Sequence, residues 1–337
     1  MVDMTTEYLG LKLTNPLVPS ASPLTGDHDS VMRLREAGAS AIILPSLFEE
    51  KIEQQEQQLD RFIHHQSIGF GEMESFHPVP NDLRTCQDEY LEYLQKLKHE
   101  LDIPVIASLN GTTAGGWLEY GKQLQQAGAD ALELNIYYIA GNGGESGSDV
   151  EQRYIDLLDS LQQHVTIPIT LKLSPQFSSP VHFIRRLEQS GAAGVALFNR
   201  FYLPDINPEQ LMVEPTLQLS VPYESLMRIR WAALLHGRIN MSVAVTGGFH
   251  NARDGIKALL VGSDVVHLCS VLLQQGPEYL SVILGEMHGW LEENEYDSVS
   301  QIKGSMSYHN APDPGAYERV NYITVLDNYT SPEGVLR

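Results

Sequence analysis

Cysteine and basic side chains are both scarce in this sequence of 337 residues. The two cysteines, Cys86 and Cys269, exclude the multiple-disulfide framework of small secreted proteins and are typical of a reducing compartment. Only 22 Lys and Arg stand against 43 Asp and Glu, which gives a net charge of −21. Such a charge repels nucleic acids and anionic lipid surfaces. We therefore expect a soluble, cytoplasmic chain whose partners are small molecules or proteins.

Several sequence patterns are also missing. No stretch approaches the roughly 18–20 apolar residues that a membrane span needs, and the start, MVDMTTEYLGLKL, lacks the pattern of a secretory signal. A G-x-G-x-x-G motif is not apparent, so direct use of NAD(P)H has no motif support. The histidines do not show the spacing of metal ligands, so we predict no metal site.

Apolar segments of strand length alternate with segments whose apolar residues recur three and four apart, the spacing of a helix that buries one face. The predicted strands cover residues 15–22, 40–47, 104–111, 131–137, 168–175, 194–199, 242–248 and 265–270. They read as nearly continuous apolar runs, as expected for strands covered on both faces.

A joint of helix, glycine and strand recurs four times. Its copies REAGASAIIL, QQAGADALEL, EQSGAAGVAL and LLVGSDVVHL turn on Gly38, Gly128, Gly191 and Gly262. Glycine just past a helix end adopts the left-handed conformation without strain, so the copies indicate one strand–helix unit used repeatedly. Eight such units with right-handed crossovers predict a (β/α)8 TIM barrel in preference to a doubly wound open sheet.

Three segments are longer than a bare barrel requires: residues 48–82, 200–222 and 301–337. Long loops that follow barrel strands form lids and substrate pockets at the C-terminal face. We therefore predict one domain, residues 1–300, with extended loops at that face. Residues 301–337 form a tail that is either a docking arm or a flexible end.

The segment VAVTGGFHNARDG predicts a phosphate site. Its strand ends in Gly247 and Gly248, which let the backbone approach a ligand, and a helix start follows, where N–H groups attract anions. The next strand ends in Cys269 and Ser270, whose amides and hydroxyl extend the cradle. The loops after strands seven and eight form the recurrent phosphate site of such barrels. The alternative interpretation is a tight turn without a ligand.

Polar residues near three other strand ends predict a polar ligand at the same mouth. Lys172 lies in the otherwise apolar PITLKLSP, where it must meet a negative partner or lose its charge, unless it reaches the rim. Asn135 and Asn199 end two further strands and supply fixed donors and acceptors for a heterocycle.

These segments together resemble the FMN-dependent dihydroorotate dehydrogenases. The order NPLVPSAS, GASAIILPS, PVPND, ELNIYY, LKLSP, LFN and VTGGFHNARDGIKALLVGSDVVHLCSVLLQQGP is similar to that family over about residues 5–300. The last block is the most specific and matches the family's flavin-phosphate segment. The resemblance implies a barrel with FMN at its C-terminal mouth, and a homodimer that oxidises dihydroorotate in pyrimidine biosynthesis.

The resemblance also implies roles for single residues. The positions that match flavin contacts are Ser20, Ala21, Ser22, Ser46, Asn135, Lys172, Gly247, Gly248, Cys269 and Ser270. The substrate contacts that are kept are Asn81, Asn135 and Asn199. Lys172 would stabilise the anionic reduced flavin, which gives it an electrostatic catalytic role.

The substrate side departs from the family. Pro45 replaces a family lysine, Ala140 replaces an asparagine, and Tyr138 occupies the position of the catalytic Cys or Ser base. A free tyrosine has a pKa of about 10, so Tyr138 suits donating a proton while reduced flavin delivers hydride to a polarised C=C. The alternative is that Tyr138 only packs in the pocket.

We therefore predict an FMN-dependent oxidoreductase that transfers hydride between flavin and a small dihydro or unsaturated CH–CH substrate. Tyr138 and Lys172 are its candidate catalytic residues, and its electron partner is unassigned. Dihydroorotate is one candidate substrate, although the altered residues argue against it. Two alternatives stay open: a flavin-free barrel lyase or isomerase that acts on a phosphorylated substrate, and a flavin-binding protein whose active site has decayed.

Overall fold

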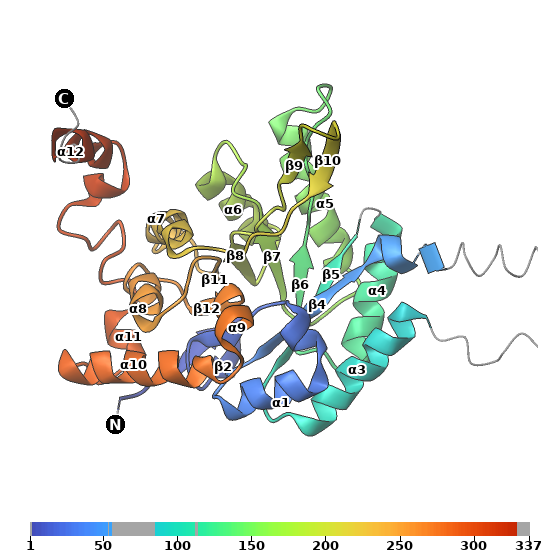
Figure 1. The fold of residues 1–337 in the computed structure, drawn as a ribbon, viewed down its shortest axis with the longest axis horizontal. Coiled ribbons are helices and arrows are strands. Elements are labelled where there is room, and N and C mark those ends of the chain that lie inside the picture. Colours follow the sequence, from blue (N-terminus) through green and yellow to red (C-terminus); the bar gives the residue numbers. More distant parts are fainter. Residues whose placement is uncertain (1, 53, 56–84, 112–113, 329–337) are drawn as a thin grey trace, which may run out of the picture.

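Eight parallel strands form a nearly closed barrel in the computed structural model, which describes residues 2–52, 54–55, 85–111 and 114–328 (Figure 1). The strands are β3 (Leu17–Pro19), β4 (Ile42–Phe48), β5 (Val105–Asn110), β6 (Ala131–Asn135), β7 (Ile169–Leu173), β8 (Gly194–Leu197), β11 (Ser242–Thr246) and β12 (Val265–Leu268). Their order is β3-β12-β11-β8-β7-β6-β5-β4. Ser40 links the two end strands, because its N–H and hydroxyl both donate to the Leu17 carbonyl, at 3.3 and 2.8 Å. The predicted (β/α)8 barrel is confirmed.

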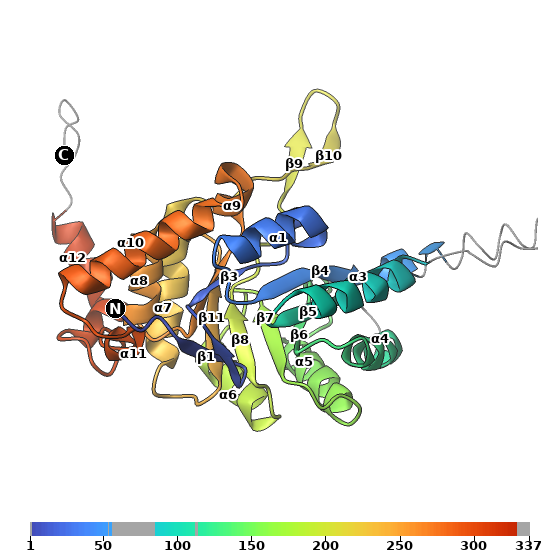
Figure 2. The ribbon, with the colours of Figure 1, turned by 90° about the horizontal axis from the view of Figure 1, so that it is seen from below.

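Helices surround the strands, as Figure 2 shows from a second direction. They are α1 (His28–Glu36), α3 (Cys86–Glu100), α4 (Ala114–Gln126), α5 (Gly147–Gln162), α6 (Pro180–Gln189), α7 (Ser225–Leu235), α8 (Ala252–Leu260), α9 (Ser270–Gln275) and α10 (Tyr279–Glu293). The four predicted joints are present: Gly38, Gly128, Gly191 and Gly262 have φ between 86° and 105°. Glycine is the residue that adopts this conformation without strain, which explains the repeat.

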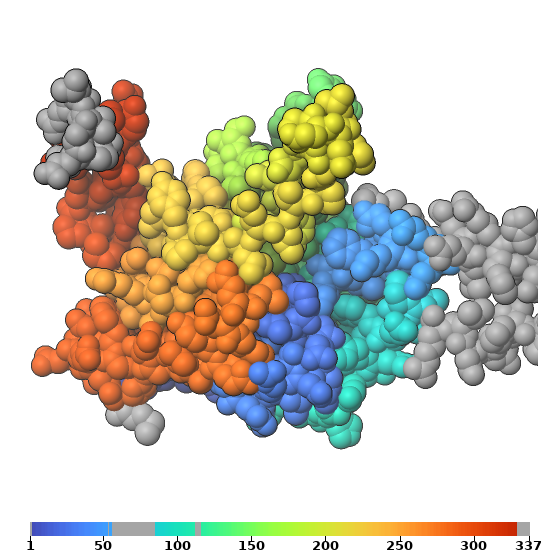
Figure 3. Space-filling model, in the orientation of Figure 1, coloured from blue at the N-terminus to red at the C-terminus, as the bar shows by residue number. Residues whose placement is uncertain are grey.

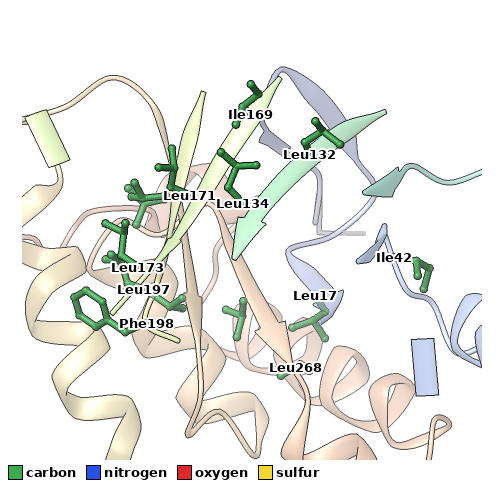
Figure 4. Close-up of a cluster of buried hydrophobic side chains, with 14 of the residues drawn as sticks. Leu17, Ile42, Leu132, Leu134, Ile169, Leu171, Leu173, Leu197, Phe198 and Leu268 are labelled. Atoms are coloured by element: carbon green, nitrogen blue, oxygen red, sulfur yellow. The ribbon is translucent and has the colours of Figure 1, made fainter. Parts of the chain in front are cut away.

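The strands separate two cores, because successive side chains point to opposite faces. Leucine-rich positions such as Leu132, Leu171 and Leu197 point outward and pack under the helices (Figure 4). The inner positions of the same strands are smaller or polar, and Ala131 and Ala196 belong to a separate inner cluster. Small inner side chains leave room for polar groups along the barrel axis.

An antiparallel hairpin of β1 (Thr6–Tyr8) and β2 (Leu11–Leu13) packs against the inner core. Tyr8 is fully buried there, and the Leu9 N–H donates to Ser242 Oγ at 2.9 Å. The hairpin therefore fills the end of the barrel from which β11 starts and leaves the opposite, C-terminal end for a site.

Two further segments extend beyond the barrel. A hairpin of β9 (Pro204–Asn207) and β10 (Met212–Pro215) follows β8, and the chain after α10 forms α11 (Val299–Ile302) and α12 (Val320–Asn328). Both the hairpin and the C-terminal segment project from the same side of the molecule (Figure 3). Within the described ranges, no helix is long and apolar enough to cross a membrane, and no cluster of His, Cys, Asp or Glu is placed to hold a metal ion.

Candidate functional site

A cavity of about 230 Å³ opens at the C-terminal ends of the strands. Nine of the predicted site residues line it: Ser20, Ala21, Ser22, Lys172, Asn199, Gly247, Gly248, Cys269 and Ser270. They come from five different parts of the chain, and only the closure of the barrel brings them together. We call this space the mouth cavity.

The paired glycines after β11 form one wall of the mouth cavity. Gly247 and Gly248 have φ of 88° and 91°, and a Cβ on Gly248 would lie 2.3 Å from the Ser225 nitrogen. The Gly248 N–H donates to Ser220 Oγ at 3.1 Å, and the Ser220 hydroxyl donates to Ser270 Oγ at 2.8 Å. Amides and hydroxyls from three loops thus converge, as a phosphate ligand requires.

Two arginines lie beside this glycine pair. A Cβ on Gly247 would lie 3.1 Å from Arg228 Nη2 and 3.6 Å from Arg200 Cδ. Arg228 is buried and donates to the Thr246 carbonyl at 3.0 Å, while Arg200 pairs with Glu224 at 2.9 Å. Two guanidinium groups against one carboxylate leave a local positive charge in a strongly acidic protein. This charge favours an anion at the glycine pair.

Lys172 is held inside the barrel by a carboxylate. Its Nζ lies 3.4 Å from Glu133 Oε1 and 3.5 Å from Ser20 Oγ. Glu133 is fully buried and Lys172 nearly so. Of the possibilities predicted for this lysine, the structure therefore shows the one with a negative partner inside the barrel.

His267 on β12 shares this interior. Its imidazole contacts the Tyr8 ring edge to face, with ring centroids 5.6 Å apart. Burial, followed by the positive charge of Lys172, lowers the pKa of His267 to about 3. The ring is therefore neutral at pH 7. Burial and the nearby Glu133 raise the pKa of Tyr8, so its phenol also stays uncharged.

A row of polar side chains runs from β4 to the end of β8 at the same end of the barrel. Asn199 Nδ2 donates to Asn135 Oδ1 at 2.5 Å, and Asn135 Nδ2 donates to Ser46 Oγ at 3.0 Å. Ser46 and Ser108 share a hydrogen bond of 2.8 Å. The structure thus connects Ser46 and Asn135 to the mouth cavity through Asn199.

Tyr138 lies on the wall of a different cavity. This second cavity, of about 570 Å³, lies between α4 and α5 and is also lined by Trp117, Tyr137 and Arg153. The Tyr138 hydroxyl donates to Glu145, and the Arg153 guanidinium lies 4.2 Å from the centre of the Tyr138 ring. The hydrogen bond to Glu145 is the main cause that raises the pKa of Tyr138. A raised pKa keeps the phenol protonated, which suits a proton donor.

Tyr137 connects the two cavities. Its ring packs against Phe201 with centroids 4.0 Å apart, and its hydroxyl donates to the carbonyl of Tyr202 at 3.4 Å. Tyr202 itself lines the mouth cavity. Asn81, the remaining predicted substrate contact, lies outside the described residues.

Five residues of this site are not among the predicted ones: Glu133, Arg200, Ser220, Arg228 and His267. Two of them carried a usable signal, since ALELN and VVHL place Glu133 and His267 at alternate positions between outward apolar residues. Arg200 directly follows Asn199 at a strand end, so it could also have been predicted from the sequence. Ser220 reaches the site from a long loop and Arg228 from a helix. The periodicity of apolar residues in the sequence does not indicate that either side chain points toward the site.

Comparisons with known proteins give the family. A family profile described as dihydroorotate dehydrogenase matches residues 3–291. The chain is 22% identical to the catalytic subunit of dihydroorotate dehydrogenase B (NAD(+)) of Thermoplasma acidophilum, over 90% of this chain and 99% of that protein. It is also 22% identical to the NAD-dependent dihydropyrimidine dehydrogenase subunit PreA of Escherichia coli K12, over 92% of this chain and 78% of the relative. The chain therefore belongs to the dihydroorotate dehydrogenase family of oxidoreductases.

Proposed function

We propose that this protein is an FMN-dependent oxidoreductase that transfers hydride between flavin and a small CH–CH substrate. The observation that carries the proposal is the mouth cavity itself. It joins a cradle of backbone amides, hydroxyls and positive charge to a buried lysine in the lining of the same space. A ligand with a phosphate at one end and a polar ring at the other matches both.

The residues present fit FMN. Gly247, Gly248 and Ser270 would hold its phosphate, with Arg200 and Arg228 supplying the positive charge. Lys172 would lie toward the polar edge of the ring and offset negative charge that develops on reduction. When bound, FMN supplies the chemistry of accepting and delivering hydride.

The substrate we propose is a small dihydro or unsaturated compound other than dihydroorotate. Pro45 lies at a register shift in β4, where it supplies no charge or hydrogen-bond donor. Asn135 and Asn199 remain as amide contacts for a polar substrate. A site that loses several hydrogen-bonding groups discriminates strongly against the substrate for which they were placed.

Tyr138 is the proton-transfer residue in this proposal. Its protonated phenol is held by Glu145 and Arg153 on the wall of the second cavity. The proposal therefore requires the substrate to extend from the mouth cavity past Tyr137 toward Tyr138. In the proposed reaction the phenol gives its proton to one carbon of the substrate while hydride goes to the other.

The first experiment is the visible spectrum of the purified protein after FMN add-back, followed by anaerobic addition of dihydroorotate. We expect flavin absorbance that dithionite bleaches and dihydroorotate does not. Bleaching by dihydroorotate would contradict the proposed substrate but keep the cofactor. Absence of flavin binding after add-back would contradict the proposal as a whole and favour a flavin-free lyase or isomerase.

We also propose that the protein is a homodimer. The β9–β10 hairpin exposes Ile206, Leu211, Met212 and Val213 to solvent, and exposed apolar patches of this kind mark protein interfaces. Sedimentation velocity of the wild type and of Leu211→Asp tests this, since a charge in the interface should shift the dimer toward monomer.

A further inference from the structure

His267 is a buried polar side chain whose hydrogen-bonding groups are unused. Both ring nitrogens lack a hydrogen-bond partner within the described part of the chain, and the residue is 1% exposed. The ring lines the mouth cavity together with Lys172 and Ser270. Because buried polar atoms in native proteins almost always have partners, we expect the partner of His267 to come with a ligand.

The orientation of His267 is fixed by its strand. Val265, two residues earlier, belongs to the inner core, whereas Val266 and Leu268 pack outward under the helices. The period of two therefore aims His267 into the barrel. Its neighbour across the β11 ladder is Thr246, which also lines the mouth cavity. The imidazole thus forms part of the cavity floor.

The floor position lies along the path of a phosphorylated ligand. Ser270 of the phosphate cradle follows His267 by three residues, which is at most roughly 10 Å of chain. Lys172 reaches Ser20 Oγ at 3.5 Å, and Val18, two residues before Ser20, lies opposite His267. A ligand that extends from the cradle toward Lys172 would therefore pass over this part of the floor. In FMN, a chain of carbon atoms that carry hydroxyl groups links the phosphate to the flavin ring.

We propose that His267 hydrogen-bonds the hydroxyl chain of the bound FMN. A neutral imidazole donates through one nitrogen and accepts through the other, and a hydroxyl group does both. The inference rests on the proposed FMN function and adds a binding residue to it. It gives His267 a role in binding rather than in stabilising the empty barrel.

If His267 had a purely structural role, its replacement would have different effects. Glu133 Oε2 is also buried without a hydrogen-bond partner in the described residues, so a bridging water between Glu133 and His267 would satisfy both groups. In that case, replacing the imidazole would destabilise the flavin-free protein and leave FMN affinity unchanged. The two roles are therefore separable by measuring stability and affinity on the same variants.

The test measures the Kd of FMN by flavin fluorescence for the flavin-free wild type, His267→Leu, His267→Gln and the control His288→Leu on α10. We expect Kd to rise about tenfold in His267→Leu, equivalent to about 1.4 kcal/mol. His267→Gln keeps a donor and an acceptor and should stay within about threefold of the wild type, as should the control. The melting temperature of flavin-free His267→Leu should equal or exceed that of the wild type, because the variant removes unpartnered polar groups.

A spectroscopic signal completes the test. The ring ¹⁵N resonances of His267, assigned by their loss in His267→Gln, should shift when FMN is added. FMN binding with equal Kd in the wild type and His267→Leu, or an unmoved ¹⁵N signal, would overturn the inference and leave the proposed function standing. A wild type that binds no FMN would overturn the proposed function and this inference together.

Discussion

The buried ion pair of Lys172 and Glu133 predicts an asymmetric response to substitution. With 3.4 Å between Nζ and Oε1 and an effective dielectric constant of about 20, the two charges attract by about 5 kcal/mol. Lys172→Met removes this attraction and leaves a carboxylate inside the barrel. We expect the free energy of unfolding to fall by about 3–5 kcal/mol. Glu133→Gln should lower the free energy of unfolding by less, because Lys172 keeps its contact with Ser20 and borders the mouth cavity.

The double variant Lys172→Met/Glu133→Gln removes both charges at once. We expect it to be more stable than Lys172→Met alone, by about 2 kcal/mol, because no uncompensated charge remains in the barrel. The test is urea unfolding at pH 7, monitored by circular dichroism, of four flavin-free proteins: the wild type, the two single variants and the double variant. These four form a double-mutant cycle. Strictly additive effects of the two single substitutions would refute the reasoning, because they would show that the charges do not interact.

Three further predictions concern other parts of the site. Gly248→Ala puts a side chain at φ of 91° and against the start of α7, so it should lower the free energy of unfolding by more than about 1 kcal/mol and weaken FMN binding. Gly143→Ala, with open space around it, is the matched control, and equal effects would contradict the cradle. The pKa of His267, about 3 when folded against about 6.5 when unfolded, means that only the unfolded state takes up its proton between these values. The free energy of unfolding should therefore fall as the pH drops below 6.5, by up to about 1.4 kcal/mol per pH unit. Urea titrations at several pH values should show a shallower fall in His267→Leu than in the wild type. Identical pH dependence in the two proteins would refute this. Tyr138→Phe should leave the Kd of FMN unchanged and slow reoxidation of the reduced flavin by a small unsaturated carbonyl compound about 100-fold, and an unchanged rate in stopped-flow measurements would show that Tyr138 only packs.

The barrel could be predicted from the sequence because two independent signals coincided. Apolar runs of strand length gave the eight strands, and glycine at the end of four helices gave the joints between helix and strand. Both signals are local: a run needs only its own residues to be buried, and Gly38 or Gly262 needs only its own backbone conformation. Local signals of this kind are preserved in the finished fold.

The interior of the barrel was less accessible to prediction. Strands such as ALELN and ITLKL resemble nearly continuous apolar runs. Every second residue in them points into the barrel, however, and most of these inward residues are polar. The pairing of Glu133 with Lys172 could not be predicted, because pairing across two neighbouring strands depends on register, and register depends on the whole sheet. The regular alternation also stops at Asn135, where β6 ends, so the direction of Tyr138 could not be derived from it.

The pairing of β3 with β12 joins chain segments that are about 250 residues apart, since Leu17 lies opposite Val266 and Val18 opposite His267. Closure of a loop of this size is entropically costly and slow. During synthesis, the first strand has to wait for nearly the whole barrel before its partner leaves the ribosome. The mouth cavity, which needs Ser20 from one end of the chain and Ser270 from the other, is therefore among the last features to form. Acquisition of flavin during refolding would report on completion of the ring of strands, later than the appearance of helical structure.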